Sequence, residues 1–361
     1  MDKIFKKMLI LAQISMHMKQ YFIVLTASAF LMACGEKNEE KTDGKDSTTV
    51  PGQEVDYSKI EVELTPKDEN GKYGYSDYSG KEVIAKQFDY AAYFKEGLAR
   101  VGKGKFEYSM PKEDAKFGFI DPNGKLVIDY LFDEANDFKD GYAAVGKGAR
   151  NQYGLFEGKW GFIDRSGKEV IPIKYERVRD FTQGVAPVQV KKGEYEYEWF
   201  YIDKKGKQLI DQKYQEAWNF LDSMAAVAKN GAIGFINKKG KTLIPFEYDN
   251  FKQIYDVMNF TSQHYYDQNG IMILSKKEKW GAINRNGKEV VKFTYDDLDV
   301  FNNGMARVEK NGKFGYVDST GAEVIKPQFE QAYSFMYGKA SVKLKGREFK
   351  IDKKGNEIKE N

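Results

Sequence analysis

The sequence predicts an all-β fold of tandem repeats with a basic period of 34 residues. Three observations support this prediction. A unit that reads KWGFIDRSGKEVIP at residues 159–172 recurs along the chain. Its apolar side chains alternate with the period of a strand, and Asn-Gly or D-x-x-G turns separate the apolar runs. Self-similarity at a fixed period is the sequence signature of a repeat architecture.

Eight copies of the motif align. They begin at residues 72, 116, 159, 198, 232, 279, 313 and 348, and the last copy is shorter. The motif glycine stands at positions 74, 118, 161, 234, 281 and 315, and Phe200 and Phe349 replace it in the other two copies. The shortest step between copies is 34 residues, as from 281 to 315, so longer steps mark insertions.

Each unit is predicted to form a three-stranded antiparallel meander. An A-x-V run such as Ala306/Val308 supplies the first strand, the W-G-F run the second, and the V-I run after the D-x-x-G turn the third. Asn-Gly pairs at 70–71, 230–231 and 311–312 join the first two strands as hairpins. In the first unit, Ile60, Val62 and Leu64 are predicted to supply the first strand.

An irregular stretch follows each meander and is pinned by two apolar side chains six residues apart. The second of these is usually phenylalanine, as at Phe335, and Ile254 holds its place in the fifth unit. The second strand is apolar on both faces, so we expect each sheet to be stacked between neighbours. The last unit holds all three of its strands, which favours an open or superhelical β-solenoid-like array. A β-propeller is the alternative.

The N-terminus predicts export and lipid attachment. Residues 18–34 carry a lysine, a short apolar run and the only cysteine, the layout of a secretory signal peptide. Leu31-Met32-Ala33-Cys34 resembles the lipobox of bacterial lipoproteins, which implies cleavage before Cys34 and a lipid on its sulfur; a free thiol is the alternative. We therefore divide the chain into a signal peptide (1–33), a flexible tether (34–56) and the repeat array (57–361).

Two further expectations concern this N-terminal region. Residues 1–17 fit poorly in front of such a signal, so Met18 is the favoured start. Gly35 stands where an aspartate would resemble an inner-membrane retention signal, which favours placement at the outer membrane, on either its periplasmic or its surface face.

The charge distribution gives no footprint for nucleic acid. The formal net charge is +3, and residues 1–33 account for all of it with four lysines and one aspartate. The remainder is neutral, whereas nucleic-acid-binding domains carry a basic patch or stripe.

The repeat resembles a known family. KWGFIDRSGKEVIPIKYERVRDF, from residue 159, looks like the WG repeat, a bacterial β-repeat found in tandem arrays. The resemblance covers nearly all of the chain after the tether. It implies a β-repeat array and no general activity.

Most of the recurring residues are predicted to be structural. Isoleucine replaces tryptophan at Ile233, so packing is favoured over sugar stacking at that motif position. The motif glycines are expected to allow close approach of neighbouring backbone. Asp and Asn interchange in the D-x-x-G turns, as at Asp164 and Asn237, which favours side-chain capping over metal binding. A second acidic position, represented by Asp89 and Asp133, is expected to cap loops.

Catalytic groups are scarce. His264 is the only histidine beyond the signal, which removes Ser-His-Asp, Cys-His and multi-histidine zinc sites, and phosphate-binding glycine loops are absent. We predict no enzymatic activity, cofactor or metal. Paired carboxylates for glycoside hydrolysis are the enzymatic alternative.

The insertions are the candidate binding site. Three of them, at 105–115, 149–158 and 191–198, lie between the first and second strands of successive units, so they should emerge on one edge of the array. Aromatic residues of this kind are common anchors in binding surfaces, although longer hairpins packing on one another would also explain them. The candidate contact residues are Phe106, Tyr108, Tyr153, Phe156, Tyr195 and Tyr197.

A fourth insertion, at 256–269, precedes a first strand. It carries His264, Tyr265 and Tyr266, which form either a second contact site or a tolerated bulge. Together these features predict a lipid-anchored, non-enzymatic binding scaffold whose partner is an envelope protein or glycan. A carbohydrate-processing enzyme and a purely structural spacer are the alternatives.

Overall fold

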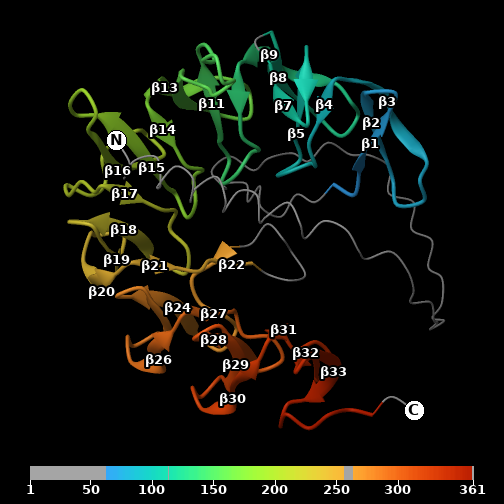
Figure 1. Cartoon of the computed structure of the whole chain (residues 1–361). Coiled ribbons are helices and arrows are strands. Elements are labelled where there is room, and N and C mark those ends of the chain that lie inside the picture. The colour runs from blue at the N-terminus through green and yellow to red at the C-terminus, as the bar shows by residue number, and fades with distance from the viewer. Residues whose placement is uncertain (1–61, 113, 256–262, 360–361) are drawn as a thin grey trace, which may run out of the picture. The chain divides into compact units, whose positions relative to one another are not determined.

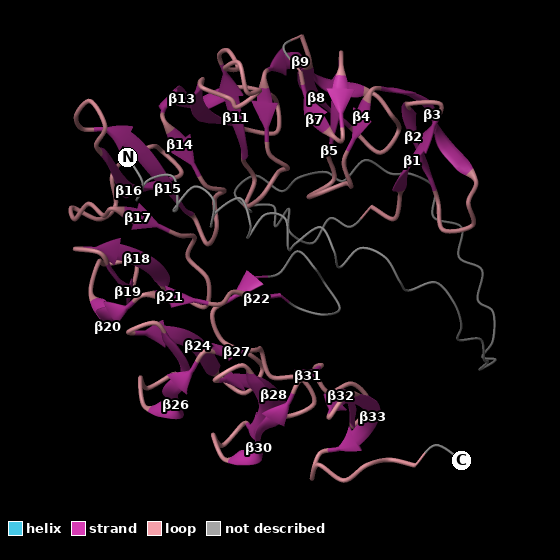
Figure 2. Ribbon diagram, viewed as in Figure 1, coloured by secondary structure: helices cyan, strands magenta, loops and turns pink. Residues whose placement is uncertain are grey.

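The computed structural model describes residues 62–112, 114–255 and 263–359, and the structural statements below concern these residues. The predicted signal peptide, Cys34 and the tether lie outside them, as do residues 57–61 and 256–262. The described chain consists of strands and loops, with no helix in it (Figure 2).

Eight sheets of three or four strands follow one another along the chain, and each corresponds to one sequence repeat (Figure 1). The first strands of the sheets are β1 (Thr65–Glu69), β5 (Ala99–Lys103), β11 (Ala143–Lys147), β15 (Val185–Lys191), β18 (Ala225–Lys229), β24 (Ile271–Lys276), β28 (Met305–Lys310) and β32 (Lys339–Leu344). The second strands are β2 (Lys72–Ser76), β8 (Lys116–Ile120), β12 (Lys159–Ile163), β16 (Tyr197–Asp203), β19 (Ala232–Ile236), β25 (Lys279–Asn284), β29 (Lys313–Asp318) and β33 (Arg347–Asp352). The third strands are β3 (Glu82–Phe88), β9 (Leu126–Phe132), β13 (Glu169–Tyr175), β20 (Thr242–Tyr248), β26 (Glu289–Tyr295) and β30 (Glu323–Phe329).

A two-residue strand that the sequence did not reveal links each sheet to the next. It follows the third strand and pairs with the first strand of the following sheet, as Ala91 does with Val101. These linking strands are β4 (Tyr90–Ala91), β10 (Glu134–Ala135), β14 (Arg177–Val178), β17 (Glu216–Ala217), β21 (Asn250–Phe251), β27 (Asp297–Leu298) and β31 (Gln331–Ala332). Two small hairpins lie outside this plan: β6 (Phe106–Glu107) with β7 (Met110–Pro111), and β22 (Ile254–Tyr255) with β23 (Gln263–His264).

The fold is therefore an all-β tandem array of antiparallel meanders, of the open, solenoid-like class. All pairings between the described strands are antiparallel, and none joins the first sheet to the last.

One predicted strand is misplaced. The first strand is β1 at 65–69 rather than the run from Ile60 to Leu64, because the two-residue Asn70-Gly71 turn sets Glu69 opposite Lys72. Val62 and Leu64 instead pack against the first core cluster.

The motif glycine makes room for a bulge in the third strand. In the third sheet Trp160 pairs with Tyr175 and Phe162 with Ile171, so three residues of β13 face Gly161 alone. A Cβ atom on Gly161 would lie 2.5 Å from the carbonyl oxygen of Ile171, which confirms the predicted close approach of backbone. Where Phe200 replaces this glycine, only isolated bridges such as Trp199 to Tyr214 stand in for a third strand.

Neighbouring sheets stack through their apolar faces and through the glycines of the D-x-x-G turns. Ile273 of β24, for example, packs in one cluster with Val308 and Val317 of the next sheet. A Cβ atom on the turn glycine Gly124 would lie 2.8 Å from the side chain of Ile84 in the preceding sheet. Stability in such an array is approximately a sum of repeat and nearest-neighbour terms.

Each sheet has two ends that differ in their bonding. At the end that we call the turn edge, tight turns such as residues 95–98 precede the first strands, and their side chains reach the next repeat. The Glu96 carboxylate accepts the backbone N–H groups of Asp140 (2.7 Å) and Gly141 (2.9 Å), and Asn303 accepts the N–H of Gly338 (3.1 Å). The other end, where the first and second strands are joined, we call the hairpin edge.

Candidate functional site

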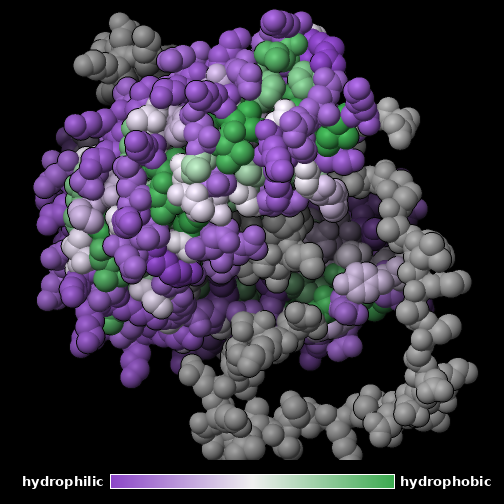
Figure 3. All heavy atoms as spheres, turned by 90° about the horizontal axis from the view of Figure 1, so that it is seen from below, coloured by the Kyte–Doolittle hydropathy of each residue, from purple (hydrophilic) through white to green (hydrophobic). Residues whose placement is uncertain are grey.

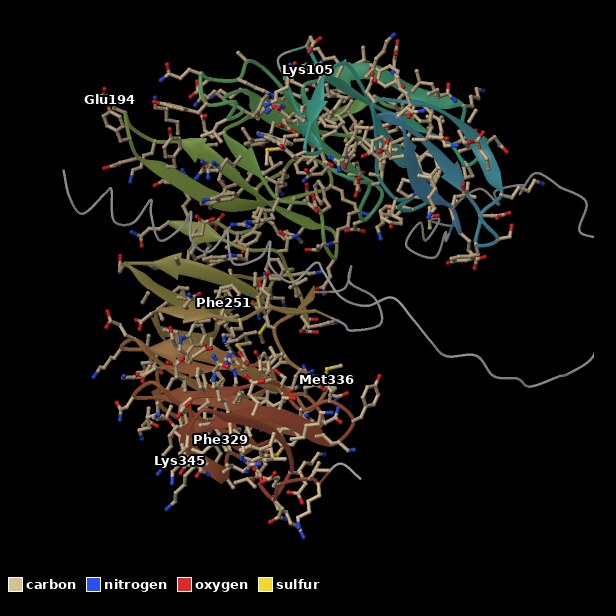
Figure 4. All side chains as sticks on the ribbon, turned by 45° about the vertical axis from the view of Figure 1, so that its right-hand side comes forward. Lys105, Glu194, Phe251, Phe329, Met336 and Lys345 are labelled. Atoms are coloured by element: carbon tan, nitrogen blue, oxygen red, sulfur yellow. The ribbon has the colours of Figure 1, made fainter. Side chains whose placement is uncertain are left out.

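The first three insertions all lie at the hairpin edge of the second, third and fourth sheets. Lys105 and Glu194, from the first and third insertions, stand at the outer ends of their hairpins (Figure 4). Lys345 occupies the corresponding hairpin of the last sheet, and Met336 lies at the opposite end of that sheet (Figure 4). The prediction that the insertions share one edge is confirmed by these strand connections.

The first insertion folds into the β6–β7 hairpin and divides its two aromatic residues. Phe106 turns onto the sheet, where its ring stacks on Tyr90 with centroids 5.4 Å apart and meets Phe117 edge-on at the same separation. Gly102 lies directly beneath it, because a Cβ atom there would come within 2.3 Å of the Phe106 ring. Tyr108 points away from the hairpin tip and is 93% exposed.

The second insertion repeats this arrangement. Phe156 meets Trp160 edge-on with centroids 5.5 Å apart, and a Cβ atom on Gly146 would lie 2.8 Å from its ring. The tip is a capped turn in which the Asn151 side chain accepts the backbone N–H groups of Tyr153 (3.0 Å) and Leu155 (3.1 Å). Tyr153 is 78% exposed and Leu155 is exposed beside it.

The third insertion extends the hairpin of β15 and β16. Tyr197 pairs with Lys191 inside the ladder, and the turn closes where the N–H of Lys192 donates to the carbonyl of Glu196 (2.8 Å). Tyr195 is 84% exposed and Tyr197 is 44% exposed. Gln189 stands where the two earlier sheets have Gly102 and Gly146, so no phenylalanine covers this position.

The six predicted contact residues therefore fall into two groups. Phe106 and Phe156 are half-buried and pack on their own sheets, so the expectation that their rings are exposed is wrong. Tyr108, Tyr153, Tyr195 and Tyr197 are exposed, and their binding role stays a prediction. The sequence carried a signal for this division, since a glycine follows the A-x-V run only in the two sheets whose insertion contains a packed phenylalanine.

The fourth insertion places its tyrosines in the core rather than on the surface. Tyr265 is fully buried, and its hydroxyl donates to the carbonyl of Asn219 (2.8 Å). Its ring meets Phe235 at 5.2 Å, the arrangement that Phe335 makes with Tyr316, so Tyr265 makes the pinning contact in the fifth repeat. The side chain of Ile254, which was predicted for this place, lies outside what the structure describes. Tyr266 is buried under Arg285, whose guanidinium lies 4.5 Å from its ring centroid.

Of the three predicted contact residues here, His264 alone remains partly exposed. Its Nδ1 lies 3.2 Å from a carboxylate oxygen of Asp222, whose other oxygen accepts the backbone N–H of Tyr265. The prediction of a contact site at Tyr265 and Tyr266 is wrong because both side chains are buried. The role of His264 stays a prediction.

The rings at the tryptophan position of the motif are covered by the protein itself. Cations lie over several of them: Arg179 at 5.3 Å from Trp199, Lys252 at 4.9 Å from Trp280 and Arg307 at 4.8 Å from Phe314. Trp280 and Phe314 are also packed against core clusters, and Trp199 and Ile233 are buried outright. This confirms packing as their role, because a sugar needs a free ring face for stacking.

Both acidic ladders cap turns and loops. In the D-x-x-G turns, Asp164 Oδ1 accepts the N–H groups of Ser166 (2.9 Å) and Lys168 (3.1 Å), and Asn237 makes the same pair of bonds. In the second ladder, Asp89 accepts the N–H of Gly104 (2.9 Å) and pairs with Lys72 (2.5 Å). The predicted capping roles are confirmed.

The pKa values of several of these carboxyls follow from their capping bonds. The hydrogen bond from Lys279 and then the backbone N–H of Asn311 lower the pKa of Asp296. Burial opposes the charge on Asp164, but the hydroxyl and N–H of Ser166 outweigh it and lower the pKa. These groups are ionised and engaged with neighbouring donors at neutral pH.

In the described part of the chain, no group of three or more His, Cys, Asp or Glu side chains is placed to hold a metal ion. Nor does any described segment form a helix long and apolar enough to cross a membrane. On the face seen in Figure 3 hydrophilic residues predominate, with hydrophobic ones between them in small patches.

Comparison with solved structures gives only distant likenesses. The match to a eukaryotic initiation factor has 10% identity and a TM-score of 0.46, and it covers 82% of this chain and 84% of the other. Apo AztD from Citrobacter koseri is 11% identical with a TM-score of 0.32, over 82% and 84% of the two chains. An uncharacterized protein from Listeria monocytogenes EGD-e is 11% identical with a TM-score of 0.38, over 72% and 88%. None of these likenesses bears on function, and the chain has no match among curated proteins.

The family model for the WG containing repeat matches the chain seven times. The matched residues are 73–105, 117–150, 160–195, 199–231, 233–256, 280–314 and 314–347, which together make up more than half of the chain. Each match begins at or near the motif aromatic of a second strand and, in most repeats, runs through the first strand of the next sheet. The chain belongs to the family of proteins built from the WG containing repeat.

Proposed function

We propose that this chain is a non-enzymatic binding scaffold of the cell envelope, held at a membrane by lipid on Cys34 and contacting an envelope protein or glycan through its hairpin edge. One observation carries the binding role. Three successive hairpins at one edge expose tyrosines, while the phenylalanines of the same insertions are packed away. Longer hairpins that served only to pack would not need these exposed rings, since exposed apolar groups favour unwanted association.

The test compares two triple variants of the array comprising residues 57–361. The first is Tyr108→Ser, Tyr153→Ser and Tyr195→Ser at the hairpin tips. The matched control is Tyr78→Ser, Tyr93→Ser and Tyr337→Ser, which removes three exposed rings away from the insertions. Recovery of partners from solubilised envelope should fall for the first variant only. Equal recovery by both, with unchanged melting curves, would remove the hairpin edge as the contact.

The lipid anchor is tested separately. Cys34→Ser should move the full-length chain from the membrane fraction to the soluble envelope fraction, because a lipidated cysteine is the only anchor proposed. Outer-membrane placement is checked by separating inner and outer membranes. A Cys34→Ser chain that still sediments with membranes would contradict this part of the proposal.

A further inference from the structure

We infer that the partner at the hairpin edge is a folded protein with an indented surface that is not anionic, rather than a glycan or a membrane. This inference rests on the proposed function and names the class of partner. Four tyrosines, Tyr108, Tyr153, Tyr195 and Tyr197, form the contact with Met110 and Leu155 beside them; we call these six residues the tip cluster. Their geometry, rigidity, area and charge each bear on the class of partner.

The tip cluster protrudes. Tyr108, Tyr153 and Tyr195 are 93%, 78% and 84% exposed, so each ring stands clear of its own hairpin and no neighbouring side chain walls it in. Sites for sugars and other small ligands are concave and enclose most of the ligand surface. Protruding aromatic loops suit the opposite arrangement, in which the loop enters a hollow of a protein partner.

The backbone holds each tip in place before any partner arrives. Asn151 caps the second tip, and the Lys192 to Glu196 bond closes the third. The first tip is a two-residue turn of Tyr108 (φ 50°) and Ser109 (φ 65°), both in the left-handed region and both without the usual glycine. Pre-formed aromatic anchors bind at a lower cost in conformational entropy.

The exposed area fits a protein interface. A tyrosine buries about 150–250 Å² when it is fully covered. Weighted by their exposed fractions, the four tyrosines offer roughly 450–750 Å² in all. Met110 and Leu155, 62% and 64% exposed, bring the total to the order of the roughly 800 Å² per partner that is typical of a specific protein interface. A single sugar chain lying on one ring would use only a fraction of it.

The charges of the insertions disfavour anionic partners. Residues 105–115, 149–158 and 191–198 carry five basic and seven acidic side chains, a net charge of −2. Several cations are already paired, including Lys112 with Glu107 (2.6 Å), Arg150 with Glu134 (2.5 Å) and Lys192 with Glu198 (3.1 Å). An anionic membrane surface would need unpaired lysines or arginines here.

The experiment uses the full chain in its own cells with a photo-crosslinking residue, p-benzoylphenylalanine, in place of Tyr108, Tyr153 or Tyr195. The control carries it in place of Tyr337, which is 91% exposed at the turn edge. We expect all three tips, but not position 337, to give one protease-sensitive adduct of the same mass. Serine at the other two tip tyrosines should lower its yield about tenfold, as expected for two residues that contribute about 0.7 kcal/mol each. The purified partner should then bind the unmodified chain in a defined stoichiometry.

The other outcomes separate the two claims. Adducts of graded mass that glycosidases or periodate remove would overturn the inference and leave the proposed binding function standing, with a glycan as partner. Lipid adducts, or an adduct of twice the chain mass, would overturn the inference in favour of a membrane or a second copy of this chain. Equal labelling at positions 108, 153, 195 and 337, or none, would overturn both.

Discussion

Replacing Tyr108-Ser109 with Asn-Gly should stabilise the array and weaken partner binding at the same time. A non-glycine residue in the left-handed region costs about 1–2 kcal/mol, and asparagine tolerates that region better than most residues. Both positions of this turn lie there, at φ values of 50° and 65°. Glycine offsets about 0.5–1 kcal/mol of this gain, because it has greater conformational freedom to lose when the chain folds. A net gain of about 1 kcal/mol remains, and Tyr108 loses no packing because it is 93% exposed.

The structure offers a reciprocal control at the same edge. Asn311-Gly312 joins β28 to β29 in the same left-handed geometry, with φ values of 52° and 70°. The double variant Asn311→Tyr, Gly312→Ser should destabilise the array by a similar amount and leave binding unchanged. Thermal melting measures both variants, and about 1 kcal/mol corresponds to roughly 1.5 °C in an array of about 300 residues. Matched melting temperatures for the wild-type chain and the Tyr108→Asn, Ser109→Gly variant would refute the strain argument, and undiminished binding would refute the role of Tyr108.

Three further predictions concern the array itself. Gly161→Ala should lower the urea midpoint by an amount equal to about 1–3 kcal/mol, because its Cβ atom would lie 2.5 Å from the Ile171 carbonyl; an unchanged midpoint would show that the third strand can shift. Asp164→Ala should cost about 1 kcal/mol while Asp164→Asn costs little, since Asn237 makes the same two bonds; equal melting of the two variants would contradict the capping role. The lowered pKa values of Asp164 and Asp296 stabilise the fold above their ordinary value of 3.8, so stability should decline as the pH falls through the folded values; a denaturation midpoint independent of pH below about 4 would exclude this contribution.

The repeat fold was predictable because its signals are local and recur. Alternation of apolar residues gives the strand period, and a two-residue turn fixes register, so strands such as β12 and β29 could be placed from residues 159–172 and their sister copies. The linking strands escaped prediction because two residues carry no periodicity. The first strand was placed too early because Ile60 to Leu64 alternates well, whereas the true strand, Thr65–Glu69, is polar and is set by its turn.

The candidate site was only half predictable, for a physical reason. An aromatic residue in an insertion gains energy either by packing on its own sheet or by meeting a partner, and composition alone does not separate these outcomes. The space left by Gly102 and Gly146 decides the question for Phe106 and Phe156. Tyr265 was misjudged because the sequence alone does not show whether the inserted residues precede or follow the pinning residue. The ring contact between Tyr265 and Phe235 shows that they precede it.

The two edges explain why insertions gather where they do. Bonds from one repeat to the next, such as Glu96 to Gly141, lie at the turn edge, so an insertion there interrupts stacking. Residues 263–269 of the fourth insertion lie at that edge, where Tyr265 supplies the pinning ring and Asp222 accepts its backbone N–H. At the hairpin edge, bonds from the N–H of Gly104 to Asp89 (2.9 Å) and from the N–H of Gly148 to Asp133 (3.1 Å) also join one sheet to the next, and both are kept although each hairpin carries an insertion beyond its glycine. Hairpins there can therefore lengthen outside these bonds, so this edge is where a stacked array can vary its contacts and keep its fold.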